Sequence, residues 1–289
     1  MWSGVVVSEY SLTALLSWLT IIMLILTIKH KRFSVLWKDS QPLCILFIAE
    51  ICIGLGYSIV GIQWILVAEK ILLNVPSSTQ FLHFAGVLSL VARWFYDSST
   101  LSVFVQRISF LCFPVLNGKL INKWLLTANL VTTFAVGIVY VGFNIALANL
   151  KVIPAKEGCF SFNCMSSHTK FLSSLSNYIV LSFSLLTLVL GSILQYLIRR
   201  YRANFKTVAE IRINTFTSSL FCLRLIFEFL PFTVDTIMRF TLGAGLGTYI
   251  GPFGAVGGAI DIFVQSFVYL YMLKRAQKTV ARQQHATGS

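Results

Sequence analysis

Six ionisable side chains lie inside long apolar runs of the sequence, where each of them needs a partner. They are Glu50, Arg93, Asp97, Arg224, Glu228 and Asp261. A charged side chain is costly inside a lipid bilayer and usually faces the interior of a helix bundle, which makes each of the six a candidate functional group. The rest of the chain has to position these groups.

Two pairs among them have the spacing of about one helical turn. Arg93 and Asp97 are four residues apart, and so are Arg224 and Glu228. Residues at this spacing share a helix face and can neutralise each other. Two interpretations are open. The pairs are self-compensated and fix helix packing, or they serve a function, either at the floor of a ligand cavity or in a switch that exchanges partners between two helices.

Glu50 and Asp261 have no charged residue at this spacing on their own helices. Both lie near the middle of an apolar run, and the two runs are neighbours if the helices form a ring. The two carboxyl groups could share a proton or a cation, or each could stay protonated. We predict a conformational role for them rather than a catalytic one.

Two backbone features also stand out. Pro231 follows Glu228 by three residues and is expected to bend its helix and free a backbone carbonyl. Gly254 and Gly258 have the G-x-x-x-G spacing that favours close packing of membrane helices.

The composition indicates where these helices lie. The chain has 289 residues, of which 56% are hydrophobic and 11% are charged, whereas a soluble domain carries about 25% charged residues. A helix of about 20 apolar residues crosses a bilayer. We predict an all-α membrane protein, a seven-transmembrane helix bundle in one domain (residues 1–289), with a short tail at 274–289. The expected spans are about 10–28, 42–68, 81–113, 124–148, 172–198, 213–237 and 249–273.

Basic residues predict the orientation of these spans. Fifteen Lys and Arg residues lie in the loops and tail on one side, or sixteen with Arg107, against five on the other side. Basic residues in short loops stay in the cytoplasm. The N-terminus is therefore expected outside and the tail in the cytosol, and the net charge of +13 follows from this bias.

Several classes of function are disfavoured. The sequence contains no metalloprotease, nucleophile-elbow or phosphate-loop motif, and its four histidines are scattered. We therefore expect no enzyme activity, no cofactor and no metal site. The basic residues are divided among loops at the membrane edge, so a nucleic-acid partner is not expected either.

Two stretches resemble chemosensory receptors. Residues 106–114, Gln-Arg-Ile-Ser-Phe-Leu-Cys-Phe-Pro, resemble the acidic–arginine–aromatic end of the third helix in rhodopsin-like G-protein-coupled receptors, with Gln106 and Ile108 in place of the acid and the aromatic residue. The loop at 158–165, Gly-Cys-Phe-Ser-Phe-Asn-Cys-Met, and the overall layout resemble the nematode serpentine seven-transmembrane chemoreceptors of class BC. The seventh span departs from rhodopsin-like receptors because it lacks the Asn-Pro-x-x-Tyr pattern.

The resemblance implies a rhodopsin-like architecture and a role in sensory transduction such as olfaction. The chain would be a plasma-membrane receptor, for example of a sensory cilium, that detects a small external molecule and signals through a heterotrimeric G protein. The expected ligand-binding residues are Arg93, Trp94, Tyr96, Asp97 and Glu228. The expected switch and coupling residues are Arg107, Glu50, Asp261 and Pro231. The alternative is a small-solute or ion transporter that uses the intramembrane carboxylates, although no inverted repeat supports it.

Cys159 and Cys164 share a loop that the charge bias places outside the cell. An oxidising compartment permits a disulfide there, and we favour it over two unpaired thiols. Both cysteines should therefore resist a membrane-impermeant thiol reagent on intact cells until a reductant is added. Labelling of both cysteines without prior reduction would contradict the bridge.

Overall fold

The computed structural model describes residues 3–30, 33–72, 76–113, 115, 117–148, 162, 170–201, 208–242, 246 and 253–287. The regular elements of this part are helices. They are α1 (Ser3–His30), α2 (Phe33–Asp39), α3 (Gln41–Ala68), α4 (Pro76–Cys112), α5 (Gly118–Ala148), α7 (Lys170–Arg200), α8 (Val208–Arg224), η2 (Leu225–Phe229), α9 (Leu230–Leu242) and α11 (Phe253–Thr287). Cys159 and Cys164, with the disulfide expected between them, lie outside the described residues.

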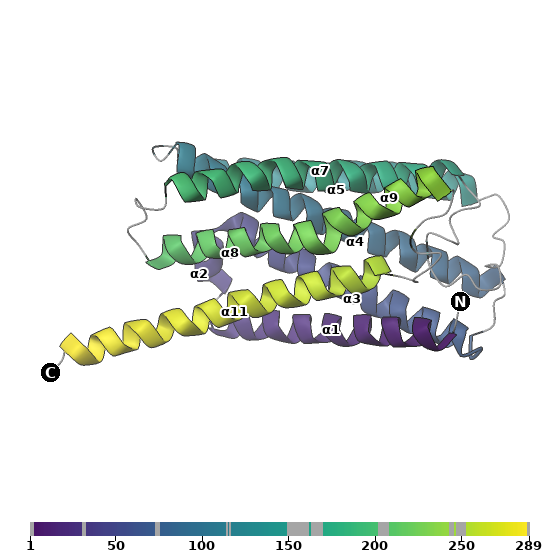
Figure 1. Cartoon of the computed structure of the whole chain (residues 1–289), viewed down its shortest axis with the longest axis horizontal. Coiled ribbons are helices and arrows are strands. Elements are labelled where there is room, and N and C mark those ends of the chain that lie inside the picture. The colour runs from purple at the N-terminus through teal and green to yellow at the C-terminus, as the bar shows by residue number, and fades with distance from the viewer. Residues whose placement is uncertain are drawn as a thin grey trace.

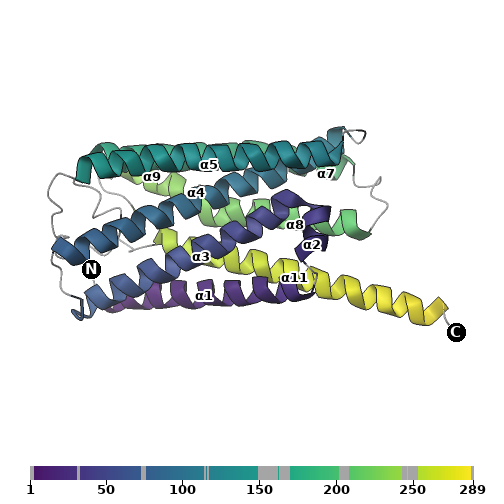
Figure 2. The ribbon, with the colours of Figure 1, turned by 180° about the vertical axis from the view of Figure 1, so that it is seen from behind.

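The long helices lie side by side in one elongated bundle (Figures 1 and 2). Helices α1, α3 and α11 pack against one another, and α5 and α7 cover the opposite side of the bundle. Helix α4 runs between these two groups and touches α3, α5, α7 and α8. The segments α8, η2 and α9 follow one another without a break. Helix α1 begins at the end of the bundle opposite to the end at which α11 finishes (Figure 1).

Five helices in the described part are long and apolar enough to cross a membrane. These stretches are Gly4–Lys29, Gln41–Ala68, Gly118–Ala146, Leu175–Arg200 and Phe253–Lys274. Large apolar side chains such as Leu15, Phe134 and Val189 are exposed on the outside of the bundle, where lipid rather than water suits them. The chain is therefore a multi-pass all-α membrane protein. The remaining long segments, α4 and α8–η2–α9, hold buried charges and are less apolar.

The helix bounds differ in places from the expected spans. A short helix, α2, precedes α3, and its Leu36 side chain is buried in the main core. Residues 274–287, the segment expected as a tail, continue α11 as helix. The start of α3 is as expected, with a proline in its first turn, and Ser40 caps it by accepting a hydrogen bond from the Leu43 amide at 3.4 Å.

The bend expected at Pro231 is present and begins before the proline. Residues Leu225–Phe229 form a π turn, closed by the Leu230 amide on the Leu225 carbonyl. Because Pro231 has no amide proton, the Phe227 carbonyl four residues earlier loses its usual donor. Figure 1 shows α9 leaving the direction of α8 after this turn.

Only one glycine of the G-x-x-x-G pair makes a close helix contact. A Cβ atom at Gly258 would overlap the Tyr57 hydroxyl and lie 2.9 Å from Tyr57 Cζ, so α3 and α11 approach closely there. No described neighbouring atom lies within 4 Å of a Cβ built at Gly254. The close packing predicted for this pair is therefore confirmed at Gly258 alone.

We predict that Gly258→Ala lowers the melting temperature of the detergent-solubilised protein, since overpacking destabilises by about 1–3 kcal/mol. The double variant G258A/Y57F should recover part of the loss because it removes the overlapping hydroxyl. Gly142→Ala is the matched control, since that glycine is exposed on α5 with no described neighbouring atom near a built Cβ. Equal melting temperatures for G258A and G142A would contradict the close contact.

Candidate functional site

The centre of the bundle holds one arginine among three carboxylates. Arg224, the last residue of α8, is 3% exposed and forms ion pairs with Asp97 of α4, Glu228 of η2 and Asp261 of α11. The pair with Asp261 joins Nη1 to Oδ2 at 3.4 Å. The guanidinium therefore connects three segments that are far apart in the sequence.

Uncharged groups complete the surroundings of Asp261. Its Oδ2 accepts a hydrogen bond from the Tyr96 hydroxyl at 2.9 Å, and its Oδ1 accepts one from Gln265 Nε2 at 2.6 Å. Gln265 Nε2 also lies 2.5 Å from the Tyr96 hydroxyl oxygen. The Arg224 guanidinium stacks on the Tyr96 ring at 4.4 Å from its centroid, a cation–π contact. These contacts hold Tyr96 at the interface of α4, α8 and α11.

The charges of α4 and α8–η2 are paired across the helix interface. Arg93 Nη2 lies 3.6 Å from Glu228 Oε1, while Asp97 pairs with Arg224. Self-compensation at the four-residue spacing is confirmed for Arg224 and Glu228, but Arg93 contacts Glu228 and the Phe232 ring. Among the described residues no ion pair joins Arg93 to Asp97. Arg224 and Glu228 therefore pair within one segment, whereas Arg93 and Asp97 find their partners across the interface.

Glu50 lies beside this cluster without joining it by a hydrogen bond. The Ser266 hydroxyl donates to its Oε2 at 3.0 Å, and its Oε1 has no hydrogen-bond partner in the described part of the chain. Asp261 is held by Tyr96, Gln265 and Arg224 instead. The sequence allows Glu50 and Asp261 to share a proton directly. In this structure no hydrogen bond joins their two carboxyl groups.

The structure brings together four of the five expected ligand-binding residues. Arg93, Tyr96, Asp97 and Glu228 all belong to the central cluster. Trp94 does not, because its fully buried ring packs edge-on against Tyr140 of α5, with 4.9 Å between the centroids. Trp94 therefore belongs to the interface of α4 and α5.

Arg107 and its neighbour Gln106 lie near the C-terminal end of α4, away from the central cluster. We call this end of the bundle the basic end, because the helix ends there carry Lys29, Lys38, Lys119, Lys123, Arg199, Arg200 and Arg212. Gln106 accepts a hydrogen bond from Ser40 at 2.8 Å and donates one to Asn122 at 2.5 Å, so it ties α4 to the starts of α3 and α5. Arg107 is half-buried and interacts electrostatically with Glu210 in the first turn of α8.

Sequence reasoning missed the uncharged polar members of the site. Gln265, Ser266 and Ser184 each bind one of its carboxylates, and Ser184 donates to Glu228 Oε1 at 3.4 Å. The position of Gln265 four residues after Asp261 was the available signal. For Ser184 the sequence holds no comparable signal, because serines are common in membrane helices.

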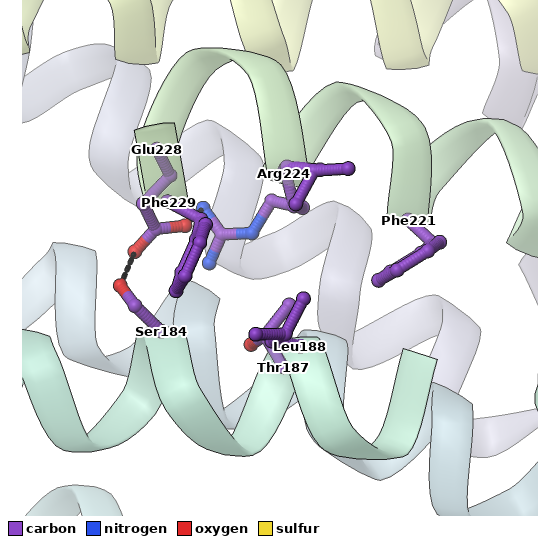
Figure 3. A pocket seen from close by; sticks show the side chains of 8 residues that line it. Ser184, Thr187, Leu188, Phe221, Arg224, Glu228 and Phe229 are labelled. Atoms are coloured by element: carbon purple, nitrogen blue, oxygen red, sulfur yellow. Dashed lines mark hydrogen bonds and ion pairs between the residues drawn. The ribbon is translucent and has the colours of Figure 1, made fainter. Parts of the chain in front are cut away.

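A narrow hollow adjoins the cluster between α7 and α8–η2 (Figure 3). Its lining residues are Ser184, Thr187, Leu188, Phe221, Arg224, Leu225, Glu228 and Phe229, and they leave no enclosed space for a water molecule. The described residues include no group of three or more His, Cys, Asp or Glu side chains that could hold a metal ion. The arrangement suits an exchange of ion-pair partners.

Comparison with protein-family models gives no match to this chain, and comparison with curated proteins gives none either.

We predict that Arg224→Met destabilises the protein by about 3–5 kcal/mol, because it leaves buried carboxylates without their cation. Adding Asp97→Asn should restore part of the stability, since it removes one of the unpaired charges. Melting temperatures of the purified single and double variants in detergent measure both effects.

The matched control is Arg212→Met, which removes a basic residue near the start of the same helix. If R224M melted at the temperature of R212M, or if D97N failed to improve R224M, Arg224 would not be the hub of the cluster.

Proposed function

We propose that this chain is a chemosensory G-protein-coupled receptor with seven membrane spans, an external N-terminus and a cytoplasmic C-terminus. It detects a small external molecule and signals through a heterotrimeric G protein. The observation that carries the proposal is the crossed pairing of charges between α4 and α8–η2. A receptor needs two conformations that a ligand can distinguish, and this interface has two ways of neutralising itself.

In the first scheme, which the structure adopts, Asp97 binds Arg224 and Arg93 binds Glu228. In the second scheme each segment neutralises itself through its own pair at the four-residue spacing, Arg93 with Asp97 and Arg224 with Glu228. Arg224 already contacts Glu228, so the exchange requires new partners only for Arg93 and Asp97. It would remove both ion pairs between α4 and α8–η2 while each charge keeps a partner.

The same two segments meet again at the basic end. There the Arg107 side chain of α4 interacts with Glu210 of α8. A movement of α8 at the level of Arg224 would alter this electrostatic interaction, and we propose Arg107 as the residue through which the ligand state reaches the basic end. The basic side chains there favour a cytoplasmic position and suit an acidic protein partner or anionic lipid.

The proposal takes α4 and α8–η2–α9 as the two spans besides the five apolar helices. About 20 residues of helix cross a bilayer, and α4 has 37. The charges of both segments meet inside the bundle, where lipid does not reach them. An odd number of spans also agrees with the start of α1 and the end of α11 lying at opposite ends of the bundle (Figure 1). The plasma membrane, including a sensory cilium, is the proposed location.

The test is ligand-dependent signalling in cells that also express a promiscuous G protein. An N-terminal tag that antibody reaches on intact cells checks both display and orientation, and calcium imaging reports the response to a panel of small odorants. We expect a response that Arg107→Ala abolishes at equal surface display, because the electrostatic interaction with Glu210 of α8 is lost.

Lys123→Ala is the matched control, since Lys123 is an exposed basic residue at the same end of the bundle. Normal signalling by R107A would remove the proposed coupling role. Silence of the displayed wild-type chain would favour the transport alternative, and solute flux would then be measured in the same cells.

A further inference from the structure

The hollow between α7 and α8–η2 combines apolar walls with buried polar atoms. Leu188, Phe221, Leu225 and Phe229 provide the walls, and Ser184, Thr187, Arg224 and Glu228 provide the polar atoms (Figure 3). Pockets for small molecules typically have this composition, in which a few polar groups orient a ligand held by apolar contact.

Two of the polar atoms in the hollow have no partner. Thr187 Oγ1 and Arg224 Nε are buried, on side chains that are 5% and 3% exposed, and neither has a hydrogen bond in the part of the chain that the structure describes. Unsatisfied buried polar atoms are uncommon and destabilising, so each needs an explanation.

Comparison with other threonines makes the case of Thr187 sharper. A buried threonine in a helix normally donates to the carbonyl four residues earlier. The described part contains five other buried threonines that do so: Thr13, Thr20, Thr27, Thr100 and Thr217. Thr187 alone among these six leaves its hydroxyl toward the hollow without that bond, so the hydroxyl is available to another molecule.

The charges around the hollow select against ions. An anion would meet the carboxylate of Glu228, with Asp97 and Asp261 behind it. A cation would be repelled by the guanidinium of Arg224. The nearby carboxylates already pair with that guanidinium and do not offset the repulsion. A neutral molecule with an oxygen that accepts a hydrogen bond from Arg224 Nε avoids both penalties.

The size and position of the hollow restrict the ligand further. The lining side chains leave no room for a water molecule, so a ligand has to part them to enter, which favours a molecule of few atoms. Only α7 and α8–η2 line it, and the adjoining Leu185 and Ile226 are exposed on the apolar surface of the bundle. The hollow therefore lies on the flank of the bundle, which the bilayer covers.

We propose that this hollow binds a small neutral molecule carrying one carbonyl or hydroxyl oxygen, which enters from the bilayer between α7 and α8. The oxygen accepts a hydrogen bond from Arg224 Nε and forms a second one with the Thr187 hydroxyl. The inference rests on the proposed function only in regarding this molecule as the ligand of a receptor. Its binding can be measured without any signalling.

Occupation of the site acts directly on the crossed ion pairs. Arg224 would bind the ligand with the same guanidinium that holds Asp97 and Glu228. Because the hollow is narrow, a ligand also displaces the Leu188 and Phe229 side chains and separates η2 from α7. A bound ligand and the ion pairs thus favour different positions of η2.

The test measures binding of defined probes to the purified full-length chain in lipid nanodiscs by ligand-detected NMR, with empty nanodiscs as the blank. The neutral probes are 2-pentanone and 1-pentanol, and the comparison probes are pentane, pentanoate and pentylamine. We expect saturable binding of the neutral oxygen-bearing probes and weaker binding of the other three.

Two variants locate the site. Thr187→Val keeps the shape of the side chain and should weaken 2-pentanone binding about tenfold, the effect of one lost hydrogen bond. Leu188→Trp should abolish binding by filling the hollow. Thr217→Val is the matched control, because that buried hydroxyl lies outside the hollow and bonds to its own helix. It should bind 2-pentanone like the wild type.

Three outcomes would overturn the inference: no saturable binding of either neutral probe to folded protein, tighter binding of pentanoate or pentylamine, or equal 2-pentanone affinity in T187V and T217V. A different result is also informative: T187V weakens 2-pentanone binding, but the displayed chain gives no signal in cells. That result supports the binding site and contradicts only the receptor function. The two proposals therefore fail separately.

Discussion

Burial of the Arg224 guanidinium among three carboxylates is the constraint around which the bundle is arranged. An isolated charge is strongly disfavoured in a low-dielectric interior, and removal of one partner leaves another charge uncompensated. The carboxylates come from α4, η2 and α11, so these segments can occupy only positions in which all of them reach Arg224. The apolar helices pack around this buried cluster of paired charges.

The same few residues hold the charges and the bend. Arg224 ends α8, and the π turn begins at the next residue. The Phe227 carbonyl, which Pro231 cannot satisfy, lies so close to α11 that a Cβ on Gly257 would be 3.1 Å from it. A π turn widens a helix locally and is frequent at functional sites. A change of ion-pair partners and a change of helix direction are therefore mechanically linked here.

The sequence predicts the helices well and their contacts poorly. Run length identifies the apolar helices because about 20 residues of helix must cross the bilayer. Pairing is different: Arg93 lies four residues from Asp97 but contacts Glu228, since spacing along one helix says nothing about the neighbour at the same depth. Thr187 was not predicted because uncharged polar residues within spans are common. The receptor function stays a prediction, because topology and charge fit several classes of membrane protein.

The unequal charge of the helices also affects how the chain enters the membrane during translation. The buried threonines of helix α1 bond to its own backbone and need no partner from a later helix. Helix α4 has to wait for Arg224, which is synthesised 127 residues after Asp97, or roughly 6–25 s later at ribosomal speed. During this interval Arg93, one turn from Asp97, can serve as a temporary counterion, until the newly made α8 arrives and takes over that carboxylate.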